Sequence, residues 1–266
     1  MSPAGSSFPS TVMASSSSSA PPAPAGLKAG LWSGTATFTS GQVAPLRWVL
    51  ALESGRMGIS AFGTCFEATL DDPPQVVRTL RGQCDANGRV EVTEATDDGT
   101  TETQVCTWLG TLAEVDGGTR ITGAFHQSSG DIGQFAAILE EPSPAHTSGL
   151  WVGSCVPDPS VEACPVNPVA WVLSLFPGTP AGEYTALGCG FFDDAGDIPG
   201  TPVLYYVLRG TCSPEGVVKL TKVYCQPVPG LTVEYEGQHD GQGAITGKWN
   251  NAFEQTFGTF TCKLRR

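Results

Sequence analysis

The chain has 266 residues and a formal net charge of −12, yet only 15% of its residues are charged. Its lysines and arginines form no basic stripe, so a nucleic-acid partner is not expected, because binding to a phosphate backbone requires clustered cations. No apolar run approaches the roughly 20 residues that cross a bilayer, and a membrane partner is therefore not expected either.

The first 29 residues form a tract rich in serine, proline and alanine, with Lys28 as its one basic residue and no acidic residue. Such a composition buries too little apolar surface to fold, which predicts a disordered tail. We expect a cytoplasmic location. A plastid transit peptide is also rich in serine and poor in acids, so a plastid location is the alternative. No secretory signal is recognised, and we therefore expect the nine cysteines to be mostly reduced.

From Leu31 onward, short segments of alternating apolar and polar residues are separated by turn residues, in a chain with 33 glycines and 21 prolines. This pattern is typical of β-strands. Eight strands are expected in each half of the chain, near residues 31–38, 46–53, 58–66, 75–84, 88–95, 103–112, 119–126 and 132–140, and near 149–156, 168–176, 183–191, 201–211, 215–223, 230–238, 243–250 and 255–264.

The two halves of the chain repeat each other. Gly30-Leu31-Trp32 opens the first copy, Gly149-Leu150-Trp151 opens the second, and further segments match in the same order. Ordered matches with small insertions at turns indicate a tandem duplication. We expect one domain over residues 30–141, a linker over 142–148 and a second domain over 149–266.

Side chains alternate across a strand, so the apolar positions of each expected strand fall on one face. All six tryptophans of the chain lie on these faces. Eight sequential antiparallel strands with one apolar face bury that face best by closing into a barrel. The sequence therefore predicts an all-β protein of two tandem, eight-stranded, antiparallel up-and-down barrels, each with about five large aromatic residues in its interior.

The expected strands resemble the calycin barrels of the lipocalin and avidin types. The resemblance is carried by the two Gly-x-Trp openings, by the eight up-and-down strands, and in the second copy by Lys263 or Arg265 as the basic end of the last strand. The first copy has no such cation. The resemblance implies an apolar or aromatic lumen that binds a small molecule, but no polar set here matches an avidin-type biotin site.

Ten residues are candidates for contact with a ligand because they are aromatic or cationic and fall on expected inner faces. They are Trp32, Trp48, Arg78, Trp108, Phe125, Trp151, Trp171, Tyr206, Tyr235 and Trp249. Arg78 aligns with Tyr206 and shares a face with Leu80. If that face points inward, the cation needs a partner or a ligand; otherwise the side chain extends out to solvent.

Other recurring residues allow both a functional and a structural interpretation. Arg81 and Arg209 each precede a glycine, and would either hold an anionic group or close a barrel end by stacking on a tryptophan. Cys65 roughly matches Cys189, and both are expected to be packed thiols. The three histidines share no metal-ligand spacing, so neither a metal nor another cofactor is expected. Catalytic residues are not identified.

Three functions fit these observations. The first is a binding protein that takes a small apolar or aromatic ligand in one or both lumens. The second is an enzyme of the cyclase or isomerase type, in which a hydrophobic lumen shapes a reactive substrate. The third is a non-catalytic scaffold with filled barrels that binds other proteins. The sequence does not indicate which proteins these are. The lumen distinguishes them, because an open one favours a ligand and a filled one favours the scaffold.

Overall fold

The computed structural model describes residues 27–54, 61–66, 77–97, 102–161, 164–177, 185–192, 204–224 and 231–265. The expected tail lies outside these residues up to position 26, whereas Lys28 and Ala29 already belong to the first strand. The starts of several expected strands, at 58–60, 75–76, 183–184, 201–203 and 230, also lie outside them. The regular elements of the described part of the chain are all β-strands.

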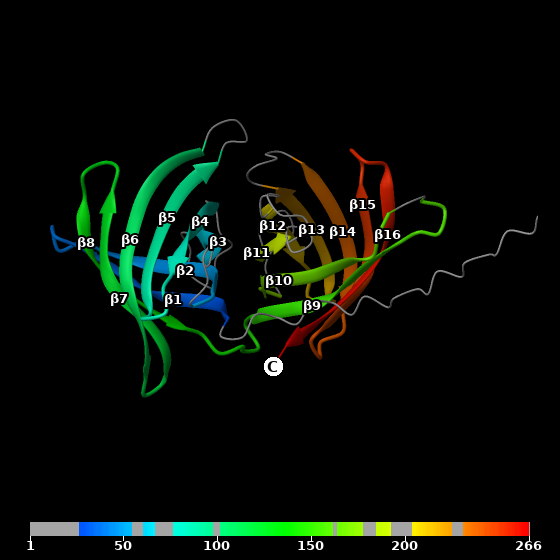
Figure 1. Ribbon diagram of the computed structural model, residues 1–266. Coiled ribbons are helices and arrows are strands. Elements are labelled where there is room, and N and C mark those ends of the chain that lie inside the picture. Colours follow the sequence, from blue (N-terminus) through cyan, green and yellow to red (C-terminus); the bar gives the residue numbers. More distant parts are fainter. Residues whose placement is uncertain are drawn as a thin grey trace, which may run out of the picture.

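The first eight strands close into one antiparallel barrel, in which β1 pairs with both β2 and β8 (Figure 1). Its strands are β1 (Lys28–Phe38), β2 (Val43–Leu52), β3 (Ala61–Phe66), β4 (Val77–Cys84), β5 (Arg89–Asp97), β6 (Glu102–Val115), β7 (Gly118–Gln127) and β8 (Ile132–Leu139). We call this unit barrel 1.

The next eight strands close in the same way, with β9 paired to both β10 and β16. They are β9 (Thr147–Pro157), β10 (Asn167–Leu175), β11 (Ala186–Phe192), β12 (Leu204–Cys212), β13 (Val217–Tyr224), β14 (Thr232–His239), β15 (Ala244–Asn251) and β16 (Thr256–Arg265). This unit is barrel 2, and the prediction of two tandem eight-stranded barrels is confirmed.

Strand register explains why the two copies share their small residues. Gly34 faces Ala137 across the β1–β8 pair, and Gly153 faces Cys262 across the β16–β9 pair. A Cβ added at Gly34 would collide with the backbone of Ala136, and one added at Gly153 would collide with Thr261. The first and last strands of each barrel therefore approach so closely that only glycine fits beside the opening tryptophan.

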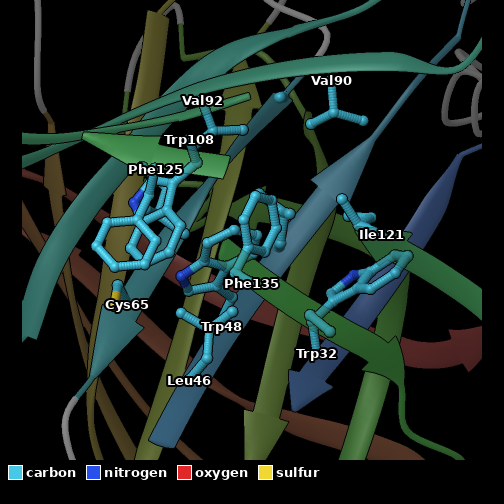
Figure 2. Packing of buried hydrophobic residues seen from close by; sticks show 14 of the residues in the cluster. Trp32, Leu46, Trp48, Cys65, Val90, Val92, Trp108, Ile121, Phe125 and Phe135 are labelled. Carbon is cyan, nitrogen blue, oxygen red and sulfur yellow. The ribbon is translucent and has the colours of Figure 1, made fainter. Parts of the chain in front are cut away.

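Each lumen is filled by a separate apolar cluster. The cluster of barrel 1 includes Trp32, Trp48, Trp108, Phe125 and Phe135, all at most 5% exposed (Figure 2). The matching cluster of barrel 2 includes the other three tryptophans of the chain. All six tryptophans thus lie inside the barrels, as strand alternation predicts.

A third apolar cluster lies between the barrels, which stand side by side in Figure 1. Its buried residues come from the outer faces of β1–β3, β10 and β11 and from the residue that follows β10: Leu31, Val49, Ala51, Phe62, Phe66, Val172, Phe176, Leu187 and Cys189. The strands β2, β3, β10 and β11 are consequently apolar on both faces, which is typical of strands covered on both sides. We call this set the inter-barrel cluster.

The inter-barrel cluster corrects the matching of two cysteines. Register pairs Trp48 with Cys65 in barrel 1 and Trp171 with Gly190 in barrel 2, so Cys65 corresponds to Gly190. Cys189 lies one residue away and faces the other barrel, where its thiol lies 3.5 Å from the carbonyl oxygen of Phe62. A shift of one residue along a strand moves a side chain to the opposite face.

The inter-barrel cluster predicts that the two barrels associate even when the chain is divided. Residues 1–141 and 142–266, produced separately and mixed, are expected to elute as a one-to-one complex in size-exclusion chromatography with light scattering. Val49→Asp in the first half should abolish the complex, because it places a charge in a buried apolar contact. Thr35→Asp, on an exposed position of β1, serves as the control. Two halves that stay separate when mixed would contradict the interface.

Candidate functional site: the polar mouths of the barrels

The nine aromatic candidates all lie within the two lumen clusters. Several of their rings pack edge to face or tilted against one another. Ring centroids are 5.2 Å apart for Trp48 and Trp108, 4.9 Å for Trp108 and Phe125, and 5.0 Å for Trp171 and Tyr235. Such contacts fill the middle of each lumen. A ligand would therefore bind at an end of a barrel, beside the rings.

The tenth candidate, Arg78, identifies that end in barrel 1. Its guanidinium donates to the carboxylate of Glu94, with 2.6 Å between Nη1 and Oε1. The indole nitrogen of Trp108 donates to the second oxygen of Glu94 over 3.0 Å. The Glu94 side chain is 2% exposed and that of Arg78 is 25% exposed, so the pair reaches from the lumen to its rim. We call these three residues the polar mouth of barrel 1.

Glu94 lies close to the end of β5, which is near the top of Figure 1, and local backbone geometry shapes the polar mouth there. Glu94 follows Val90 and Val92 on the inward face of β5. Directly after Glu94, the pairing with β6 shifts by one residue. Such irregularities redirect side chains and are common next to functional sites. Glu94 was not among the candidates, although extending the alternation of β5 by one step would have found it.

Barrel 2 carries a different charge at the equivalent position. Register pairs Glu94 with Leu80 and Lys222 with Leu208, and these two leucines match in the two copies. The Lys222 Nζ lies 4.3 Å from the ring centroids of both Tyr206 and Tyr224. Desolvation lowers the pKa of Lys222 from 10.5 to about 8. Lys222, Tyr206 and Tyr224 form the polar mouth of barrel 2.

Tyr206 is held in place by its surroundings. It occupies the position that Arg78 has in barrel 1. Its hydroxyl fills the space that a side chain at residue 190 would need. Residue 190 is therefore glycine, whereas the equivalent residue of barrel 1 is Cys65. The hydroxyl is also hydrogen-bonded to the side chain of Trp171, and burial raises its pKa well above 10. Tyr206 therefore stays protonated and presents a fixed ring face to Lys222.

Burial also controls the thiols at the two mouths. The pKa of Cys106, opposite Glu94, is raised to about 12, mainly by burial and then by the charge of Glu94. The pKa of Cys155 in barrel 2 is raised to about 11 by burial, although the charge of Lys222 opposes the shift. Both thiols stay protonated near neutral pH, so neither has the character of a nucleophile.

Three indole donors in the lumens have no hydrogen-bond partner among the described residues. They belong to Trp32 and Trp48 of barrel 1, which are fully buried, and to Trp249 of barrel 2, which is 6% exposed. Buried N–H groups in native structures are nearly always paired with protein or water. Each lumen therefore contains at least one buried indole N–H without a hydrogen-bond partner among the described residues.

The remaining predictions of side-chain placement are corrected by the register. Arg81 pairs with Phe62 and Arg209 with Leu187, so both arginines lie on outer faces beside the inter-barrel cluster and close no lumen. Lys263 also points outward, because Cys262 and Leu264 on either side of it pack on the core of barrel 2. The ring next to Trp151 is instead that of His239, with centroids 5.7 Å apart.

An open groove of about 1000 Å³ lies between the barrels near the linker. Its lining includes Leu139, Leu150, Glu141, Gln242 and Arg265. The three polar side chains among these are exposed, so none of them has lost its contact with water. The polar mouths differ because their charges are desolvated, which makes them the better candidates for a functional site.

Comparison of the chain with protein-family models, with curated proteins and with solved structures found no match in any of the three. The closed barrels are therefore established by the structure, while the resemblance to calycins stays a prediction. Among the described residues, no three or more potential ligands gather as a metal site would require. In the same part of the chain, no helix has the length and apolarity needed to cross a membrane.

Burial of the Lys222 ammonium makes a prediction about stability and pH. The lowering of its pKa from 10.5 to about 8 corresponds to about 3 kcal/mol of destabilisation at neutral pH, and replacing the lysine by an apolar residue recovers part of it. Lys222→Met should therefore increase the free energy of unfolding at pH 7 by about 1–2 kcal/mol.

The gain in the free energy of unfolding should shrink as the pH rises from about 8 through 10.5. In this range Lys222 is already mostly neutral in the folded protein, and in the unfolded chain it gradually loses the proton that it still carries. Urea denaturation at several pH values measures the difference. Lys219→Met, on the exposed face of the same strand, is the control and should show no such trend. A gain in stability that is equal at all pH values would contradict the burial of the charge.

Proposed function

We propose that the protein binds small aromatic or apolar molecules with an oxygen-bearing head group, one at the polar mouth of each barrel. A single observation carries this proposal. Both copies place desolvated charge at the same point of an otherwise apolar lumen, but with different residues, Glu94 with Arg78 in one and Lys222 in the other.

The energetic argument starts from the stability of the barrels. Replacing a buried ion pair by apolar residues of similar volume is often neutral or stabilising. The rest of each lumen is apolar, so the fold itself does not require charge at these positions. Buried charges that are retained against their desolvation cost are concentrated at functional sites.

The chemistry of each mouth indicates which head group it would take. In barrel 1, Glu94 neutralises Arg78, so a neutral group such as a hydroxyl fits best, donating to the carboxylate and accepting from the guanidinium. The half-buried Phe38, whose ring lies 5.0 Å from that of Phe125, would contact the aromatic body of the ligand. In barrel 2, Lys222 and its tyrosines offer an amine between two ring faces.

The scaffold is the alternative function that a separate observation supports. The aromatic rings in the middle of both lumens are in mutual contact, as a barrel stabilised without a ligand would have them. The cyclase or isomerase alternative has no comparable support, since the described thiols at the mouths are protonated. Ligand titration separates binding from the scaffold.

Titration of the protein with naphthylmethanol by isothermal calorimetry tests the proposal. We expect saturable binding, and we expect the double variant Arg78→Met/Glu94→Met to weaken the barrel 1 site by about 10-fold or more, because charge-assisted hydrogen bonds contribute about 1.5–3 kcal/mol. Replacing both partners avoids leaving one buried charge alone.

The matched control is Arg89→Met/Glu91→Met, which removes the same two charges from exposed positions of β5. Its binding should equal that of the unchanged protein. Thermal unfolding of both double variants shows that they are folded before they are compared. The absence of saturable binding in the unchanged protein, with naphthylmethanol and with other aromatic alcohols, would favour the scaffold.

A further inference from the structure

We propose that Lys222 captures an aromatic aldehyde as an imine, so that barrel 2 is a covalent and reversible carbonyl-binding site. This inference rests on the proposed function, because it assigns a ligand class to one of the two mouths. It goes further in giving Lys222 a nucleophilic role that its counterpart in barrel 1, the carboxylate of Glu94, does not have.

The position of the amine is the first argument. Lys222 is 7% exposed and its Nζ lies between two tyrosine rings, each centroid 4.3 Å away. The two rings are themselves in contact, with centroids 5.6 Å apart and planes inclined at 66°. The amine is thus held in a fixed place against two aromatic rings.

Access is the second argument. Tyr224 and Cys164 are only partly buried, and both pack on the lumen cluster of barrel 2. Through these two side chains the cluster reaches the surface of the described part of the barrel. Lys222 is next to this surface, because its Nζ lies 4.3 Å from the centroid of the partly exposed Tyr224 ring.

Protonation is the third argument. Only the neutral amine attacks a carbonyl carbon, and lysines serve this purpose when desolvation lowers their pKa. With a pKa of about 8, about half of Lys222 is neutral at pH 8, against well under about 1% for an ordinary lysine. The site therefore supplies the reactive form of the amine close to neutral pH.

The reaction is balanced without a further reactant. The nitrogen lone pair of Lys222 forms a bond to the aldehyde carbon, and the carbonyl oxygen becomes the hydroxyl of a carbinolamine after proton transfer from nitrogen. Loss of that hydroxyl with the remaining amine proton, as one water molecule, leaves the carbon–nitrogen double bond. No atom is oxidised or reduced, and addition of water reverses the capture.

Reductive trapping on the full-length protein tests the inference. The protein is incubated with naphthaldehyde and cyanoborohydride, which reduces the imine to a stable amine, and peptide mass spectrometry locates the adduct. We expect a single saturating adduct on Lys222, whose yield rises with a midpoint near pH 8 because the pKa of this lysine is about 8. Adducts spread over the exposed lysines, without preference for Lys222, would overturn the inference.

Two variants sharpen the test. Lys222→Arg keeps a cation between the rings and should remove the adduct, whereas Lys219→Arg changes an exposed lysine of the same strand and should leave the adduct in place. An adduct of unchanged yield in Lys222→Arg would overturn the assignment. The location of the adduct in the unchanged protein decides the question even if a variant is unstable.

Naphthylmethanol separates the failure of this inference from the failure of the proposed function, because it has the same ring system and no carbonyl. If the alcohol binds to barrel 2 and the aldehyde leaves no adduct on Lys222, the covalent step is wrong and the binding function stands. If neither molecule binds, both proposals fail.

Discussion

Both barrels depend on the closure of a β-sheet, which assigns each side chain on a strand either to the lumen or to the outer face. Closure is achieved in the same way twice, with β1 paired to β8 and β9 paired to β16 beside a glycine that no other residue could replace. In a closed barrel, a charged residue at an inward position of a strand must therefore point into the lumen. Glu94 and Lys222 are held in the lumens for this reason, and their surroundings had to supply partners.

The same constraint explains how the barrels are joined. Inward residues of β2 and β10 fill the lumens, so the apolar outward residues Val49 and Val172 would face water in isolated barrels. Both valines are instead buried in the inter-barrel cluster, so the two barrels form one unit with a shared apolar contact. The polar mouths are separate from this contact, and each has its own chemistry.

Much of the lumen could be predicted from the sequence, because a period of two fixes the face of every residue once one tryptophan is placed. That rule placed all six tryptophans correctly. It did not reveal that Arg78 pairs with Glu94, because this diagonal contact depends on the register between the neighbouring strands β4 and β5. The matching of Cys65 with Cys189 failed by a single residue, and the inter-barrel cluster was missed although the continuous apolar runs of β2 and β10 signal burial on both faces.

The central claim is that desolvated charge at the two mouths serves a ligand rather than the fold. Native mass spectrometry of the protein purified from its own source tests this claim most directly, because it requires no prior choice of ligand. We predict one or two small molecules bound per chain, which are released when the protein is denatured. Preparations in which every molecule of the folded protein has the mass of the bare chain would contradict the claim and leave two filled barrels as a scaffold.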